Sequence, residues 1–270
     1  MSNGLKIGKS NATIIIIIGI FTTIGFMLAC GPPSRVVKLP ESKWGEKYFY
    51  SYEPPEKKAP GSVKITMAIV NPYFAEKAAI HPIYSKVAKG FAKSMAIDLD
   101  KIIIAKGMTI TGPFESLDMM TYPDKKNANL TLTPGILINT QSRDISQWAS
   151  REEGGIRKTV EVKIDGWVVL EMREPLSSEK IWIKKIEVAE MAETPEIIAE
   201  KVPVYRKQGD IIPAGYRPGN LLYDGRPDAM ANMMKKMYPA IMQTCWKYID
   251  SEEIVVLDEK AKEIRSLKRY

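Results

Sequence analysis

Cysteine and histidine are almost missing from this chain, which has two cysteines and one histidine in 270 residues. Cys30 and Cys245 stand near opposite ends, so no disulfide framework can form, and the lone His81 excludes a metal site built from several histidines. The sequence also lacks Gly-x-Ser-x-Gly, His-Glu-x-x-His and Cys-x-x-Cys, which mark common hydrolase, zinc and redox sites. We therefore expect a non-enzymatic protein that uses no cofactor.

A basic motif of the kind that binds nucleic acid is missing as well. The formal net charge is +7, from 39 basic and 32 acidic side chains. The excess is spread along the sequence, and no basic helix or Arg-aromatic motif occurs. This charge indicates a soluble basic surface, with anionic lipid, sialylated glycans or acidic proteins as alternative partners.

The first 30 residues contain no acidic side chain. Lys6 and Lys9 precede an uncharged run of 18 residues, Ala12–Ala29, and a basic region followed by an apolar one is typical of a secretion signal. As a helix the run is about 27 Å long, close to the ~30 Å thickness of a bilayer core. A membrane helix that stays in the protein is therefore the alternative interpretation.

The end of the apolar run favours the signal. It reads Met27-Leu28-Ala29-Cys30, with a small residue before the cysteine that would receive diacylglycerol in a bacterial lipoprotein. We predict that residues 1–29 are a lipoprotein signal peptide and that Cys30 is the lipidated, palmitate-bearing start of the mature chain. Gly31 follows in place of the aspartate that retains lipoproteins in the inner membrane, which favours the outer membrane.

Prolines are concentrated after the cysteine, with six between residues 31 and 61. Because proline removes backbone donors and favours extended chain, residues 30–61 are predicted to form a lipidated, semi-rigid tether. The aromatic segment Tyr48–Tyr52 is expected to pack on the following domain as a short strand, with a ligand-binding platform as the alternative.

Residues 62–270 have the pattern of a single α+β globular domain. Strands are predicted over residues 62–72, 108–114 and 128–141, and a helix over residues 75–106 places apolar side chains at steps of three or four. Strand, long helix and strand indicate a crossover unit. The expected fold class is α+β, with a mixed, largely antiparallel sheet packed against a long N-terminal helix and C-terminal helices.

Antiparallel strands are expected in the second half of the domain. Residues 159–164 and 167–172 flank Asp165-Gly166, which predicts a two-residue hairpin. The next strand, residues 181–188, changes phase at Lys184-Lys185, which predicts a bulge there. Two polar stretches without an apolar period, residues 142–158 and 202–226, are predicted to be long exposed loops.

Two helices are predicted to close the chain, over residues 230–248 and 254–267. The first carries a methionine stripe that either packs on the sheet or forms a binding groove. Cys245 belongs to this stripe and is expected to be an inert core thiol. His81, near the start of the long helix, is expected to be a capping or surface residue.

Several segments carry a family resemblance. The cysteine and tether are followed by KGMTITG, by GWVVLEMREPLSSEKIWIKKIEV (Gly166–Val188) and by AMANMMKKMYPAIMQ (Ala229–Gln243). The combination resembles the neuraminyllactose-binding hemagglutinin family, lipoproteins of the outer membrane and flagellar sheath of Gram-negative bacteria. The resemblance implies a non-enzymatic adhesin, anchored by lipid in the outer membrane at the cell surface or flagellar sheath, that binds sialylated glycans.

The resemblance also points to a binding segment. The family's proposed glycan site is short and rich in lysine and arginine, and the corresponding stretch here is residues 139–158. Its candidate residues are Arg143, Trp148, Arg151, Arg157 and Lys158, cations for a sugar carboxylate and a ring that could stack on the sugar. The alternative function is a structural or assembly lipoprotein of the envelope or flagellum that faces the periplasm and binds no glycan.

Overall fold

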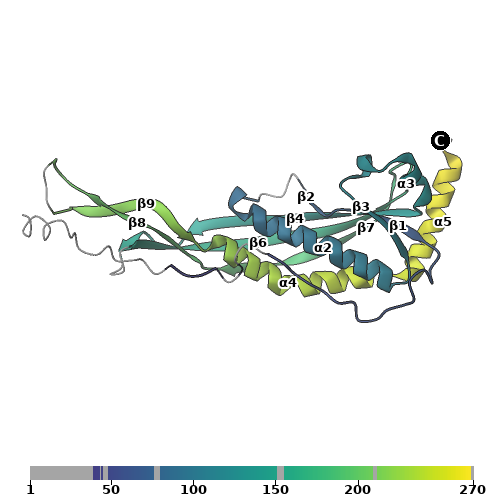
Figure 1. The fold of residues 1–270 in the computed structure, drawn as a ribbon, viewed down its shortest axis with the longest axis horizontal. Coiled ribbons are helices and arrows are strands. Elements are labelled where there is room, and N and C mark those ends of the chain that lie inside the picture. Colours follow the sequence, from purple (N-terminus) through teal and green to yellow (C-terminus); the bar gives the residue numbers. More distant parts are fainter. Residues whose placement is uncertain are drawn as a thin grey trace, which may run out of the picture.

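The computed structural model describes residues 39–268, apart from residues 43, 45–47, 76–79, 151–154 and 209–211. A long, curled mixed sheet runs through the molecule, and two long helices lie along one of its faces (Figure 1). A third helix and the C-terminus lie at one end of the long axis. The predicted α+β fold, with a long helix and C-terminal helices against a mixed sheet, is confirmed.

The strands are β1 (Thr66–Val70), β2 (Tyr73–Phe74), β3 (Thr109–Phe114), β4 (Leu130–Asp144), β5 (Ala149–Ser150), β6 (Gly155–Arg173), β7 (Lys180–Glu193), β8 (Glu196–Val204) and β9 (Gly215–Asp224). The helices are η1 (Pro82–Tyr84), α2 (Ser85–Ala105), η2 (Leu117–Met119), α3 (Tyr122–Asn127), α4 (Arg226–Tyr248) and α5 (Ser251–Leu267). The sheet order is β3-β1-β4-β6-β8-β9, with β2 beside β4 and with β5 and β7 beside β6. Strands β1 to β4 pair in parallel, and the other pairs are antiparallel.

The longest strand, β6, shows which face of the sheet holds the core. Its even-numbered residues from Val160 to Met172 are buried, whereas the odd-numbered residues between them are half-buried. The buried side chains join one apolar cluster with Phe91 and Leu99 of α2 and Met234 of α4. Because successive side chains of a strand point to opposite faces, one face of β6 packs against helices and the other meets solvent.

The long helix begins later than its apolar period predicts. Residues 73–74 form β2, η1 precedes α2, and α2 starts at Ser85 rather than near Ala75. Pro82 explains the delay, because a proline disfavours helical backbone at the residue before it. His81 is extended there, and its Nδ1 accepts a hydrogen bond from the backbone N–H of Ile83 at 3.3 Å. The predicted capping role of His81 is confirmed.

The predicted hairpin at Asp165-Gly166 is wrong, because β6 runs through these residues without turning. Gly166 pairs with Ile138 of β4 in the middle of the sheet. Its φ is +134°, and a Cβ at this position would lie 2.0 Å from the carbonyl oxygen of Leu137. The glycine is thus required by positive φ and by the close approach of two strands.

The predicted bulge at Lys184-Lys185 is also wrong, since these residues pair with β6 in continuous register. The register shifts instead opposite Asp165, where β7 has two residues, Ala189-Glu190, against one. Trp182 is buried and Ile183 is 54% exposed. Ile186 and Val188 are buried as predicted, whereas at the start of β7 Trp182 faces the core in place of Ile181 and Ile183.

Much of the two predicted loops is strand. β4 continues to Asp144 and β6 begins at Gly155, while residues 202–226 contain the end of β8 and all of β9. Residues 216–221 of β9 are all exposed, so side chains on both faces of this strand meet solvent. A strand that is exposed on both faces has no hydrophobic alternation, which is why the pattern missed it.

The segment before β1 lies against the helices, so residues 48–61 do not form the predicted stalk. Tyr50 is buried, and its ring centre lies 5.6 Å from that of Phe91 and 5.4 Å from that of Tyr238. Its backbone N–H donates to Ser94 Oγ at 3.0 Å. The aromatic segment packs on the domain as predicted, but as irregular chain rather than a strand.

The C-terminal helices are fixed by both apolar and polar contacts. The methionine stripe of α4 is buried in the core, so it packs on the sheet as predicted, and Cys245 is a buried free thiol. Arg265 of α5 pairs with the buried Glu174 after β6 at 2.9 Å. No helix in the described ranges combines the length and apolar character needed to cross a bilayer. The predicted signal peptide and Cys30 lie outside the described residues.

Candidate functional site

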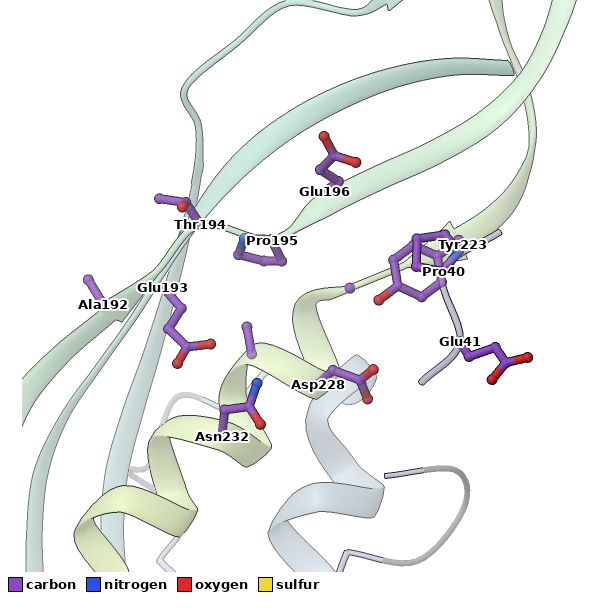
Figure 2. Close-up of a pocket in the computed structure, with 12 residues that line it drawn as sticks. Pro40, Glu41, Ala192, Glu193, Thr194, Pro195, Glu196, Tyr223, Asp228 and Asn232 are labelled. Atoms are coloured by element: carbon purple, nitrogen blue, oxygen red, sulfur yellow. The ribbon is translucent and has the colours of Figure 1, made fainter. Parts of the chain in front are cut away.

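An acidic cavity of about 620 Å³ lies where the N-terminus of α4 meets the turn between β7 and β8 (Figure 2). Four carboxylates line it: Glu41, Glu193, Glu196 and Asp228. Within the described chain, no group of three or more histidine, cysteine or acidic side chains is placed to hold a metal ion. The negative charge of the lining suits a cationic group of a ligand or partner, such as an amine.

Three of these carboxylates already have partners. Lys236 Nζ lies 2.7 Å from Glu193, Arg157 lies 3.1 Å from Glu196, and Ser42 Oγ donates to Asp228 at 2.7 Å. A cationic ligand would have to compete with these contacts. The cavity is thus a weaker candidate for a cation-binding site than its four carboxylates alone would indicate.

The predicted glycan-binding residues are not gathered at one place. Arg143 lies on β4, Trp148 precedes β5, and Arg157 and Lys158 are neighbours on β6. Because neighbouring strand residues point to opposite faces, Lys158 shares the face of the core and Arg157 the opposite face. Arg151 lies outside the described residues.

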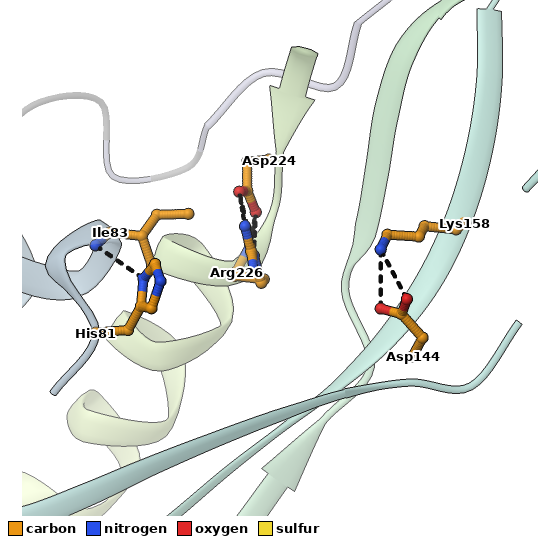
Figure 3. Close-up of polar contacts among 6 residues, drawn as sticks. All are labelled: His81, Ile83, Asp144, Lys158, Asp224 and Arg226. Atoms are coloured by element: carbon orange, nitrogen blue, oxygen red, sulfur yellow. Dashed lines mark hydrogen bonds and ion pairs between the residues drawn. The ribbon is translucent and has the colours of Figure 1, made fainter. Parts of the chain in front are cut away.

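Each described cation of the predicted site is paired with a carboxylate. Arg143 Nε lies 2.7 Å from Glu161, and Lys158 Nζ lies 2.9 Å from both oxygens of Asp144 (Figure 3). Arg157 pairs with Glu196, at the rim of the acidic cavity. These pairs leave no cluster of unpaired cations for a sugar carboxylate.

Trp148 contributes to packing rather than to an open aromatic surface. It is half-buried against the main apolar cluster, and Lys158 Nζ lies 5.2 Å from its ring centre. In Figure 3 the Lys158–Asp144 pair lies on the same side of the sheet as the start of α4, where Arg226 pairs with Asp224. A sugar ring stacked on Trp148 would have to displace Lys158.

The opposite face of the sheet gathers polar side chains into a row. The register of β4 and β6 pairs Asn139 with Asp165, Gln141 with Lys163 and Arg143 with Glu161. Asn139 donates to Asp165 at 3.1 Å, and Lys163 lies 3.4 Å from Glu190 of β7. Amides, cations and carboxylates therefore alternate along one surface, as in sites that hydrogen-bond hydroxyl-rich ligands.

A cavity of about 180 Å³ marks one end of this row. It is lined by Gln141, Ser142, Arg143, Glu161 and Lys163. The Arg143 side chain is 73% exposed despite its ion pair, so its guanidinium can still reach a ligand. We call these five residues the sheet-face cavity.

An aromatic ring lies further along the same face. Trp167 follows Lys163 and Asp165 at strand spacing, and Lys185 Nζ lies 3.5 Å from the centre of its ring. The sequence prediction included Arg143 but missed Gln141, Lys163 and Trp167. The alternation of β6 would have revealed the last two if Asp165-Gly166 had not been interpreted as a turn.

Comparisons with known proteins support the fold of this chain. No protein-family model matches the chain, and no curated protein sequence matches it. A solved structure of a Helicobacter pylori protein, named as a homolog of neuraminyllactose-binding hemagglutinin, is similar in fold, with a TM-score of 0.54 and 16% identity. The match covers 80% of this chain and 99% of that one.

A second solved structure has a much lower similarity score. This DUF330 protein from Xanthomonas campestris has a TM-score of 0.28 and 8% identity over 82% of this chain and 98% of that one. The match with a TM-score of 0.54 shows that the chain shares its fold with the Helicobacter pylori protein. The predicted resemblance holds at the level of the fold.

Proposed function

We propose that this chain is a non-enzymatic envelope protein that is anchored by lipid at Cys30 and acts by binding at its surface. The sequence at the end of the apolar run supports the anchor, and the fold shared with the Helicobacter pylori protein supports an envelope location. In this proposal the protein resides in the outer membrane, at the cell surface or in the flagellar sheath.

The finer proposal is an adhesin that binds sialylated glycans through the sheet-face cavity. One observation carries it: the exposed guanidinium of Arg143 lies beside an amide and an ammonium group on an open sheet face. An arginine can bind a sialic acid carboxylate through two parallel hydrogen bonds. Trp167 lies on the same face, and a sugar that stacks on its ring would displace Lys185, whose Nζ lies 3.5 Å from the ring centre.

Binding of purified mature protein, residues 30–270, to a glycan array tests this site. Arg143→Ala should reduce binding to sialylated glycans at least about tenfold, because a charge-assisted hydrogen bond is lost. Glu161→Gln should increase it, because it removes the carboxylate that now competes for Arg143. Arg157→Ala is the matched control, since Arg157 pairs at the acidic cavity. Binding that is the same in all four proteins would refute the site.

The alternative is a structural or assembly lipoprotein that faces the periplasm. The acidic cavity favours it, because carboxylates suit a protein partner with basic side chains and not a sialylated glycan. Protease treatment of intact cells separates the two functions. An adhesin should be cut from the surface, whereas a periplasmic domain should stay whole until the outer membrane is opened.

The anchor has its own test. Cells grown with labelled palmitate should incorporate it into the wild-type chain and not into Cys30→Ser. Label that persists in the variant would contradict lipidation at this residue. This result is independent of glycan binding, so anchor and adhesin can fail separately.

A further inference from the structure

The β8–β9 hairpin extends beyond the helices at one end of the molecule, opposite α5 and the C-terminus (Figure 1). We call the described residues 201–208 and 212–217 of this hairpin the arm tip. Apolar side chains are exposed there: Tyr205 is 47% exposed, Ile212 81% and Tyr216 48%. Exposed apolar side chains that gather at one end of a protein can mark a contact with a membrane or a partner.

The arm tip is also basic. It contains Lys201, Arg206, Lys207 and Arg217. With Asp210, which lies between its two parts in the sequence, residues 201–217 have a formal charge of 4 − 1 = +3. The net charge of the entire chain is only +7. Lys201 Nζ lies 4.0 Å from the ring centre of Tyr216. Tyrosine and isoleucine among arginines and lysines are the side chains that favour the interface of an anionic membrane.

The start of the described chain lies at the base of this hairpin. Pro40 and Glu41 line the acidic cavity together with Tyr223, close to the end of β9 (Figure 2). Pro40 is ten residue steps after Cys30, and an extended chain of that length spans at most about 35 Å. Strand β8 from Glu196 to Val204 spans about 26 Å. The connection to Cys30 is therefore longer than β8, so the end of this strand, where the arm tip begins, can reach the bilayer that would hold the anchor.

We propose that the arm tip binds the anionic lipid surface to which the chain is anchored. Arg206, Lys207 and Arg217 approach the headgroups, and Tyr205 and Ile212 enter the interfacial layer. This proposal rests on the proposed anchor at Cys30. A lipid surface is favoured over a protein partner because the connection to Cys30 keeps the base of the hairpin within about 35 Å of the bilayer, and because basic and apolar side chains together suit an anionic lipid interface. The bound molecule would stand on its arm, with α5 farthest from the membrane.

A spin label at Ile212→Cys in the lipidated protein tests this arrangement. The protein is reconstituted into phosphatidylcholine vesicles with or without phosphatidylglycerol, and flotation first establishes that the anchor holds it there. The other cysteines do not interfere, because Cys245 is buried and Cys30 carries the lipid. We expect the label to become accessible to oxygen dissolved in lipid, and shielded from a water-soluble relaxation agent, only with phosphatidylglycerol. A label at Val256→Cys, 64% exposed on α5, should stay in water in both vesicles.

Charge reversal provides the matched variants. Arg206→Glu/Arg217→Glu changes the formal charge of residues 201–217 from +3 to −1. Each unit of charge near the surface changes lipid affinity about fivefold, so this variant should lower the fraction of lipid-bound tip at least about 100-fold. Lys126→Glu/Lys260→Glu makes the same change in charge at exposed positions outside the arm tip and should have no effect. Three results would each overturn the proposal. The protein could float with the vesicles while residue 212 stays in water, the lipid contact of residue 212 could be the same without phosphatidylglycerol, or this contact could require an added protein. Failure of flotation itself would instead contradict the anchor.

Discussion

Asp100 of α2 provides a stability prediction whose sign and pH dependence both follow from the structure. The carboxylate lines a cavity of about 380 Å³ with Pro72, Lys93 and Pro113, and its Oδ1 is buried without a hydrogen-bond partner. Burial raises the pKa of Asp100 from 3.8 to about 6. The folded protein thus holds this proton more tightly than the unfolded chain does, so ionisation of Asp100 favours unfolding.

The magnitude follows from the difference in pKa. A difference of about 2 corresponds to about 3 kcal/mol between the two protonation states. Because the side chain is partly exposed, solvent reduces this, and about 1–2 kcal/mol is expected. Asp100→Asn should therefore increase the free energy of unfolding by about 1–2 kcal/mol above pH 6, where the wild-type carboxylate is charged. The gain should shrink as pH falls from 6 and vanish below 3.8, where both states hold the proton.

Urea unfolding of the mature protein at pH 7.5 and at pH 3.5 measures this gain. Asp118→Asn, at an exposed position of η2, is the matched control and should leave stability unchanged at both values. A variant of Asp100 that is no more stable than wild type at pH 7.5 would refute the argument from burial. A gain of equal size at both pH values would show that ionisation is not its cause.

Three further predictions concern buried groups. Tyr238→Phe removes a 2.7 Å hydrogen bond to the buried Asp98 carboxylate and should lower the free energy of unfolding by about 2 kcal/mol. Calorimetry should then show a Tm lower by about 4–8 °C, and a change under about 1 °C would contradict the prediction. Gly166→Ala should lower the free energy of unfolding in urea by about 2 kcal/mol or more, because the added Cβ would overlap the Leu137 carbonyl. A variant as stable as wild type would show that glycine is not needed at this position. Burial raises the pKa of Cys245 to about 12, so its thiol should react with a disulfide reagent only after unfolding, and prompt labelling of the folded protein would contradict this.

The parts of the fold with a regular apolar period could be predicted from sequence. The period of three and four placed Phe91 and Leu99 on the core face of the long helix, and the stripe of α4 behaved in the same way. The end of the long helix could also be predicted, because α2 ends next to Gly107, whose φ is +88°. Its start could not, because the period continues upstream of a proline that prevents a helix there.

Strands that form mainly by hydrogen bonding to a neighbouring strand could not be predicted from an apolar period. β9 is exposed on both faces between residues 216 and 221, so it exists through its hydrogen bonds to β8 and not through burial. Sequence periodicity reports burial and has no information on pairing between distant segments. The loop assigned to residues 202–226 is the result of that limit.

The Asp-Gly pair at 165–166 connects the error in the fold to the error in the site. As a turn, it would end one strand at residue 164 and leave residues 142–158 as a free loop, in which basic side chains could gather around a ligand. As the middle of β6, it instead extends the pairing with β4 to Asp144, and that register places Glu161 beside Arg143. The ion pair of Arg143 with Glu161 thus depends on a glycine that allows β4 and β6 to approach. The same register creates the sheet-face cavity, so a substitution that shifts β6 by one residue should abolish the cavity by turning Lys163 toward the core.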